Sequence, residues 1–198
     1  MPEDPNAEES KTLTIPNTLP ILPLFNMVVF PKMMFPMEVT GDTSLSLVDE
    51  AMAKDRMIGL TLSKKGQMDG PHPPEDYHAV GTSVVILKMA KAADKKAQLL
   101  VQGLGRFRIK SFVEGKPYLQ AEVEPLEDQE VKDLEVEALM ANLVNLFDRI
   151  VKLSPFLPQE FGMMAKSITD PGILSDIIAS IINAAPEEKQ SILEILDV

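Results

Sequence analysis

Along residues 13–125 the apolar side chains come in short runs separated by turn residues, a pattern typical of β-strands. Polar or glycine-containing turns at 90–96 and 114–116 separate neighbouring runs, which favours antiparallel hairpins. We predict strands over residues 56–62, 80–90, 97–112 and 117–126. Because Gly103 and Gly105 permit a sharp bend within the third run, we expect the strands to form a small antiparallel β-barrel-like lobe.

One helical pattern interrupts this region, over residues 42–55. Asp42 or Thr43 can cap its start, because either side chain can accept a hydrogen bond from a backbone amide of the first turn. The apolar residues of the segment share one helical face, and they are Leu45, Val48 and Met52. We therefore predict one helix within the β-barrel-like lobe.

The most apolar segment of the chain, LPILPLFNMVVFPKMMFPMEV at residues 19–39, contains four prolines. Proline fixes φ and removes a backbone donor, which excludes a long helix, and the apolar side chains exclude a flexible polar linker. We predict short extended pieces that wrap the wall of the lobe and are broken at Pro20, Pro23, Pro31 and Pro36. The cost in strand hydrogen bonds is small if these prolines lie at edges and bends.

After Pro125 the apolar spacing becomes that of helices. The predicted helices cover residues 128–153, 158–168, 169–184 and 186–198. In the first of them, helical spacing relates Leu139, Leu143, Leu146, Ile150 and Leu153. Thr169 or Asp170 can cap the third. The last pattern runs to Val198 without a stop signal, so we expect this helical region to be truncated before a linker helix.

These patterns together predict an α+β fold in three parts. Residues 1–12 form a disordered acidic tail, residues 13–125 a β-barrel-like lobe with one helix, and residues 126–198 an α-helical bundle lobe. No secretory signal or membrane-spanning run is recognisable, because the apolar opening segment is punctured by proline. We expect a soluble protein of the cytoplasm.

Charge and composition exclude several classes of function. The net charge is −11, and it is concentrated after residue 125, where the chain has 5 Lys and Arg residues but 14 Asp and Glu residues. An acidic surface repels phosphate backbones and anionic membranes, so neither nucleic acid nor a membrane is a predicted partner. The chain has no cysteine and only two histidines, His72 and His78, which argues against a metal site.

Three stretches of the sequence resemble one known family. LPILPLFNMVVFPKMMFPMEV is similar to the opening signature of the N-terminal domain of Lon, the ATP-dependent protease. AVGTSVVILKMAKAADKKAQLLVQGLGRFRIKSF resembles its central hairpin, and SITDPGILSDIIASIINAAPEEKQSILEILDV its later helical segment, in the same order. Departures from the family pattern occur at Phe25, Asn26, Lys32 and Gln102, and they concern surface contacts more than the fold.

The resemblance implies a domain that captures unfolded or tagged protein substrates and supports assembly of a hexameric ring. In that family the ATPase and the Ser-Lys peptidase lie later in the chain, and ATP and magnesium belong to those parts. This chain has no GxxxxGK[ST] phosphate loop, and GLGRFR carries Arg108 where a GxGxxG motif needs its third glycine. We therefore predict no catalytic residue and no cofactor here.

Two apolar clusters are the predicted substrate contacts. Met33, Met34 and Phe35 can form an exposed edge that holds unfolded segments, because methionine adapts to varied apolar partners. The alternative is that these residues fill the core. A second cluster comprises Phe156, Leu157 and Phe161, which can face a partner or simply staple a helical hairpin.

Arg106 and Arg108 alternate with Phe107, so both arginines share one face of a strand. They can clamp acidic side chains of the helical lobe or of a partner, or they can form an ordinary solvated strand face. Both residues are predicted electrostatic contacts.

The preferred hypothesis is a non-catalytic module for substrate recognition and assembly in a Lon-type ATP-dependent serine protease that degrades misfolded, damaged and regulatory proteins. A free-standing protein that binds unfolded polypeptides is an alternative. An RNA-binding barrel is a further alternative, disfavoured by the low aromatic content of 5% and by a net charge of −2 before residue 126. An enzyme in its own right is the least favoured hypothesis.

Overall fold

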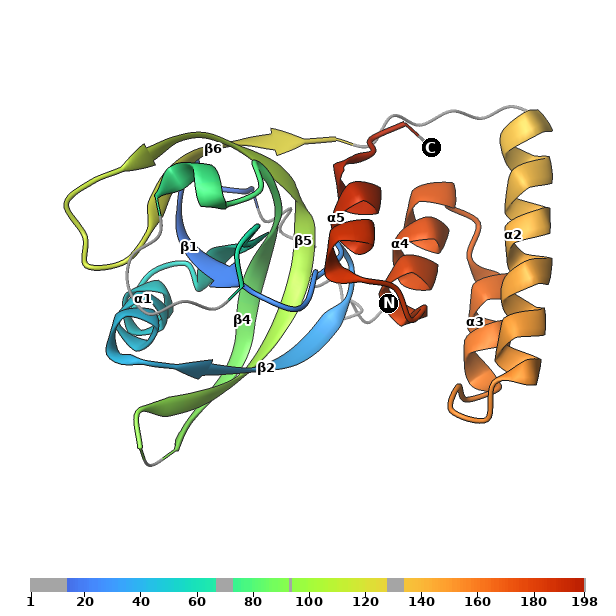
Figure 1. The fold of residues 1–198 in the computed structure, drawn as a ribbon, viewed down its shortest axis with the longest axis horizontal. Helices are drawn as coiled ribbons and strands as arrows, with labels where there is room; N and C mark the ends of the chain where they lie inside the picture. The colour runs from blue at the N-terminus through green and yellow to red at the C-terminus, as the bar shows by residue number, and fades with distance from the viewer. Residues whose placement is uncertain (1–13, 67–72, 93, 128–133, 198) are drawn as a thin grey trace, which may run out of the picture.

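The computed structural model describes residues 14–66, 73–92, 94–127 and 134–197 (Figure 1). Within these residues the strands are β1 (Thr18–Leu24), β2 (Met34–Thr40), β3 (Met57–Leu62), β4 (Val80–Ala92), β5 (Lys96–Val113) and β6 (Gln120–Leu126). The helices are α1 (Asp42–Met52), α2 (Leu134–Leu153), α3 (Glu160–Ser167), α4 (Pro171–Ile181) and α5 (Pro186–Glu194). The predicted tail at 1–12 and the start of the helix predicted at 128 lie outside the described residues.

The structure contains both strands and helices, with the strands first and most of the helices after them, which agrees with the predicted α+β class. The strand order is β2-β5-β4-β3-β1-β6, and β6 also pairs with β5, so the ladder closes on itself through five strands. We call β1 to β6 with α1 the β lobe, and α2 to α5 the helical lobe. The exact domain boundaries stay a prediction.

The expectation that all strands form antiparallel hairpins was wrong for one pair. β1 and β3 run parallel, with Ile21 opposite Gly59 and Leu24 opposite Leu62. The chain between them forms β2 and α1, and this crossover is what permits a parallel pair. A local run of residues cannot reveal it, because the partner strand lies far away in the sequence.

The prolines do not break the strands as predicted, except at Pro31. β1 continues through Pro20 and Pro23, and β2 continues through Pro36. Successive amides point to opposite sides of a strand, and the amide of Gly41 donates to the carbonyl of Lys95, which immediately precedes β5. The backbone nitrogen of Pro36 therefore points away from β5, to the open edge of the sheet, where a missing hydrogen-bond donor costs little.

The two prolines of β1 are tolerated for a similar reason. The amide of Ile21 donates to the carbonyl of Leu119, just before β6, so the backbone nitrogen of Pro20 points toward β3. The pairing of β1 with β3 begins only at Ile21. The backbone nitrogen of Pro23 points to the side of β6, and the pairing of β6 with β1 has already ended at Pro20. Each missing amide thus falls where no partner strand needs it.

The predicted bend in β5 is confirmed. The register of β4 and β5 shifts between Ser83 and Val84, which lie opposite Gly105 and Gly103, so one extra residue bulges from β5. A Cβ atom on Gly103 would lie 2.5 Å from the Phe30 carbonyl oxygen. Glycine is therefore needed here so that two backbone segments can approach closely.

The helix ends partly match the predictions. Asp170 caps α4, since its side chain accepts a hydrogen bond from the Ile173 amide at 2.8 Å. Neither predicted cap of α1 functions as one: the N-cap is Gly41, whose φ of 90° suits the turn out of β2. α5 ends at Glu194 rather than continuing to Val198, so the expected uninterrupted last helix was wrong.

Within the described residues, two apolar cores lie in the β lobe, one lies in the helical lobe, and a further cluster joins the lobes. The larger core lies in the β lobe between its sheet and α1, and the helical lobe has its own core centred on Phe147, Val151 and Leu174. A smaller cluster joins the lobes, where Phe30 and Val80 meet Ala179 and Leu193. In Figure 1, α5 lies against the β lobe, α4 follows, and α2 is the outermost helix.

No helix within the described residues combines the length and the apolar character that crossing a membrane requires.

Candidate functional site

A groove of about 800 Å³ opens in the β lobe between β1 and β2, which do not pair with each other. β6 pairs with β1 only at residues 18–20, and β2 pairs only with β5. The second half of β1 and the outer side of β2 therefore leave strand edges open toward the groove. We call this feature the β1–β2 groove.

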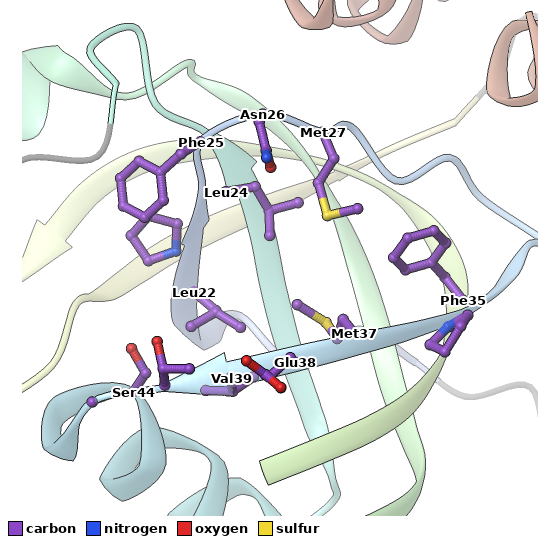
Figure 2. A pocket seen from close by; sticks show the side chains of 14 residues that line it. Leu22, Leu24, Phe25, Asn26, Met27, Phe35, Met37, Glu38, Val39 and Ser44 are labelled. Carbon is purple, nitrogen blue, oxygen red and sulfur yellow. The ribbon is translucent and has the colours of Figure 1, made fainter. Parts of the chain in front are cut away.

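Most of the residues that line the groove are apolar, although polar atoms contribute the larger part of its accessible surface. Its floor is formed by side chains that also belong to the β-lobe core, namely Leu22, Leu24, Met37 and Val39. Its rim carries half-buried Phe25, Met27 and Phe35. Figure 2 shows Leu24, Met27 and Met37 directed into the space between the two strands, with Phe35 at one end.

The one charged side chain among the residues lining the groove is Glu38, and its charge is compensated. Its carboxylate accepts hydrogen bonds from Gln98 at 2.9 Å and from Lys96 at 3.3 Å. By the alternation of β2, the amides of Glu38 and Thr40 point to the free side of the strand. The groove thus offers backbone donors and acceptors beside an apolar floor, which is the arrangement that accepts an added strand.

The first predicted cluster is divided between surfaces. Phe35 lines the groove, and Met34 is exposed on the neighbouring face of β2. Met33 packs instead on the cluster that joins the two lobes. The prediction missed two groove residues, Met27 and Met37. Met37 was detectable, because Phe35, Met37 and Val39 alternate along β2 and so share one face, whereas Met27 lies after β1 and no local pattern indicates it.

The second predicted cluster lies in the helical lobe, away from the groove. Phe156 is 90% exposed in the connection between α2 and α3. Leu157 and Phe161 pack against the core of the helical lobe. Of this cluster, Phe156 alone is exposed, so the three residues do not form one surface.

The two predicted arginines have different environments. Arg106 is buried and forms a paired contact with Asp176 of α4, with Nη1 to Oδ2 at 3.0 Å and Nη2 to Oδ1 at 2.5 Å. Its Nε donates to the Leu193 carbonyl at 3.0 Å. Arg108 is exposed on β5. Arg106 therefore bridges the two lobes and is not available to a partner.

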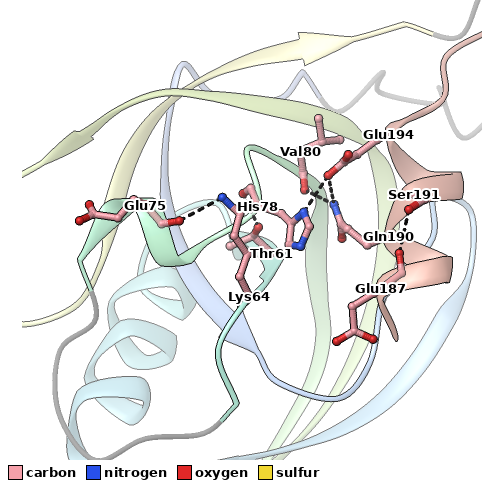
Figure 3. A network of polar contacts seen from close by, with 9 residues as sticks. All are labelled: Thr61, Lys64, Glu75, His78, Val80, Glu187, Gln190, Ser191 and Glu194. Carbon is pink, nitrogen blue, oxygen red and sulfur yellow. Dashed lines mark hydrogen bonds and ion pairs between the residues drawn. The ribbon is translucent and has the colours of Figure 1, made fainter. Parts of the chain in front are cut away.

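A second polar contact joins α5 to the β lobe (Figure 3). His78 Nδ1 lies 2.9 Å from a carboxylate oxygen of Glu194, and the Gln190 side-chain amide donates to the Val80 carbonyl at 3.0 Å. Gln190 also donates to Glu194 at 3.0 Å. The network is structural: it ties one helix to the start of β4.

Helix α1, which contributes Ser44 to the groove lining, is held in place by a charged cluster at its other end. Hydrogen bonds from Lys54, Tyr118 and Lys116 lower the pKa of Glu50 to about 2, from an ordinary value of 4.5. Burial, and then the hydrogen bond to Glu50, raise the pKa of Tyr118 to about 12. Ionised Glu50 thus links α1 to the segment before β6.

Within the described residues, no three His, Asp or Glu side chains gather closely enough to hold a metal ion. The prediction that the chain needs neither metal nor cofactor remains a prediction.

Residues 18–198 match the family model described as the ATP-dependent protease La (LON) substrate-binding domain. The chain is 61% identical over 201 residues to a Lon protease of Syntrophus aciditrophicus, covering 100% of this chain and 25% of that protein. It is 42% identical over 184 residues to a Lon protease of Desulfosudis oleivorans, covering 93% of this chain and 22% of that protein. The chain thus spans about a quarter of the length of these relatives.

Two solved structures have a similar fold. One is the N-terminal domain of a Mycobacterium avium complex Lon protease, with a TM-score of 0.73, 23% identity and 91% of each chain covered. The other is a Lon N-terminal domain protein from Xanthomonas campestris, with a TM-score of 0.64, 20% identity and 91% of each chain covered.

Proposed function

The chain belongs to the substrate-binding domain family of the ATP-dependent protease La (LON), and we propose that it captures protein substrates by holding an extended apolar segment in the β1–β2 groove. The observation that carries this proposal is the coincidence of two open strand edges with an apolar floor. An extended segment can add its backbone to the free edge of β2 while its side chains enter the groove. Folded proteins rarely expose such segments, so the groove selects unfolded ones.

The size of the edge sets the length of segment that fits. β2 has seven residues, which at roughly 3.3 Å per residue gives an edge of roughly 23 Å. Pro36 lies within this edge and provides no donor, so the pairing is interrupted near its middle. Such a short, interrupted ladder favours weak and sequence-tolerant binding, which suits a site that must accept many substrates.

In the same proposal this chain is the non-catalytic recognition part of a larger protease. ATP hydrolysis with magnesium, and peptide cleavage by a Ser-Lys pair, are assigned to the remaining three quarters of the length of the relatives. The closed ring of strand pairings serves as the barrel-like body that carries the groove, and the helical lobe serves assembly into a hexameric ring in the cytoplasm. The substrates are misfolded, damaged or tagged proteins.

The test uses fluorescein-labelled casein, which is unfolded, and measures its anisotropy as the chain is added. Replacing both Met27 and Phe35 with alanine should weaken binding about tenfold, because two apolar rim contacts are lost. Met34→Ala is the matched control, since Met34 is exposed on β2 but does not line the groove. Equal affinity of the double variant and the unchanged chain, with both folded, would reject the groove.

A second pair of variants tests the backbone edge. Glu38→Pro removes an amide on the free side of β2 and leaves the ladder to β5 intact, whereas Glu38→Ala removes only the side chain. If substrates add a strand, the proline variant should bind casein several-fold more weakly than the alanine variant. Identical affinities would mean that the groove holds side chains without strand pairing.

A further inference from the structure

The chain contains 12 methionines but neither cysteine nor tryptophan. Sulfur is the atom of a protein that a mild peroxide oxidises most readily, so methionine is the residue type through which a peroxide changes this chain. Four of the methionines lie between residues 27 and 37, and they are Met27, Met33, Met34 and Met37. Their surroundings in the fold therefore determine what oxidation of this segment does.

Two of the four methionines line the β1–β2 groove. Met27 follows β1 and is half-buried at the rim, and Met37 is buried in the floor with 7% exposure. Figure 2 shows both side chains directed into the space between the strands. The other residues of the lining are Leu, Pro, Phe, Val, Asn, Glu, Thr, Gly and Ser, which a mild peroxide leaves unchanged. Oxidation of the groove lining therefore means oxidation of these two sulfur atoms.

Exposure sets the order in which the sulfur atoms react, because peroxide has to reach them. Met34 is 64% exposed on the neighbouring face of β2 and does not line the groove. Met27 is partly open to solvent at the rim, whereas the floor residue Met37 is shielded. We expect Met34 to react first, Met27 next and Met37 last. Met34 is thus a nearby methionine whose oxidation leaves the lining of the groove unchanged.

We propose that Met27 is an oxidation site through which a hydroperoxide reversibly weakens the capture of substrates, an inference that rests on the proposed function of the β1–β2 groove. The thioether sulfur gives an electron pair to one oxygen of the peroxide, and the O–O bond breaks. The products are methionine sulfoxide and, when the oxidant is hydrogen peroxide, water. The sulfur is oxidised by two electrons and the peroxide is reduced by two.

The sulfoxide weakens the groove because it places a polar oxygen where an apolar side chain was. Met27 packs against the β-lobe core, and the half-buried rings of Phe25 and Phe35 belong to the same rim. An apolar substrate segment laid against the sulfoxide would remove water from its oxygen without supplying a hydrogen-bond donor. Burial of such an unpaired polar group is unfavourable, so the affinity should fall by about three- to tenfold.

The modification is reversible by chemistry that does not touch the rest of the chain. A methionine sulfoxide reductase with a dithiol returns the sulfoxide to the thioether, while the two thiols become a disulfide and the oxygen leaves as water. The chain itself has no cysteine, so this thiol chemistry acts on the sulfoxides alone. Groove affinity should therefore recover when Met27 is reduced.

The test treats the whole chain with hydrogen peroxide for increasing times and removes the peroxide by gel filtration before casein is added. Peptide mass spectrometry measures the oxidised fraction at each methionine, and fluorescence anisotropy measures the affinity for labelled casein. We expect no loss of affinity while Met34 is converted, and a fall of about three- to tenfold as Met27 is converted. Reductase with dithiothreitol should restore the affinity. Urea denaturation verifies that each oxidised sample is folded.

Two variants assign the effect to one sulfur atom. Met27→Leu keeps an apolar side chain of similar size but has no sulfur to oxidise, so peroxide should change its affinity by less than about twofold. Met34→Leu is the matched control and should keep the full sensitivity of the unchanged chain, because Met34 does not line the groove. Each variant is compared with its own affinity before treatment, so the effect of the substitution itself cancels.

The inference is overturned if Met27 stays reduced while Met34 is converted, or if Met27 is fully converted without loss of affinity. An equal loss in Met27→Leu, or no recovery after Met27 is reduced, overturns it as well. The double alanine variant of Met27 and Phe35 reports on the groove separately. If that variant binds casein like the unchanged chain, the proposed function fails; if it binds more weakly while oxidation has no effect, the present inference alone fails.

Discussion

The contact between Arg106 and Asp176 predicts how the two lobes depend on each other. The guanidinium comes from β5 and the carboxylate from α4, and both side chains are almost completely buried. Replacing Asp176 with alanine would remove the paired carboxylate contact from a buried guanidinium. Loss of one partner of a buried pair costs about 3–5 kcal/mol of folding free energy.

The expected loss of folding free energy is large enough to measure by urea denaturation or by thermal denaturation. In a protein of this size 1 kcal/mol lowers the melting temperature by about 2–4 °C, so Asp176→Ala should lower it by about 6–20 °C. Hydrogen exchange should also increase in α4 and α5 more than in β3 and β4, because the lost contact is the one that holds the helices to the sheet.

A double variant separates the cost of an unpaired charge from the value of the pair. Arg106→Met combined with Asp176→Leu replaces both charges with apolar side chains of similar size. Its stability should lie within about 1–2 kcal/mol of the unchanged chain, the remainder reflecting the Leu193 carbonyl that loses a donor. The reasoning is refuted if Asp176→Ala costs less than about 1 kcal/mol, or if the double variant is no more stable than the single one.

Three further predictions concern the β lobe and a helix cap. Asp170→Ala should lower the free energy of unfolding by about 1 kcal/mol, measured in urea, because the first turn of α4 loses its side-chain acceptor. Gly103→Ala should cost about 1–3 kcal/mol in the same assay, since its Cβ would lie 2.5 Å from the Phe30 carbonyl oxygen; Gly66→Ala, where a Cβ meets nothing within 4 Å, is the control. Because the pKa of Glu50 is lowered on folding, its ionised carboxylate stabilises the folded chain fully above pH 4.5, and this stabilisation is lost as the pH falls toward about 2. Glu50→Gln should therefore flatten the acid side of a plot of unfolding free energy against pH.

Much of the fold could be predicted because local patterns decide it. The change from short apolar runs to helical spacing near Pro125 separates the strands from the later helices, and Asp170 caps α4 as its side chain suggests. The bend in β5 follows from Gly103 and Gly105, which sit where the ladder shifts register. These features depend on residues that are close in sequence.

Long-range pairing could not be predicted in this way. The parallel pairing of β1 with β3, and the second pairing of β6 with β5, depend on surfaces that exist only once the sheet has formed. The β1–β2 groove results from the same pairings, because it lies where the second half of β1 and the outer side of β2 each lack a partner strand on one side. Composition identified Phe35 as a candidate, but only the alternation of β2 relative to its neighbours shows that Met37 faces the same space.

Arg106 joins the lobe that carries the proposed site to the helical lobe. The β1–β2 groove belongs to the β lobe, and α4 and α5 lie between that lobe and α2, the outermost helix. The Arg106–Asp176 pair and the His78–Glu194 contact hold this intermediate layer to the sheet. Because the groove itself belongs to the β lobe, weakening the layer by Asp176→Ala should reduce the stability of the whole chain before it changes the affinity of the β1–β2 groove for casein.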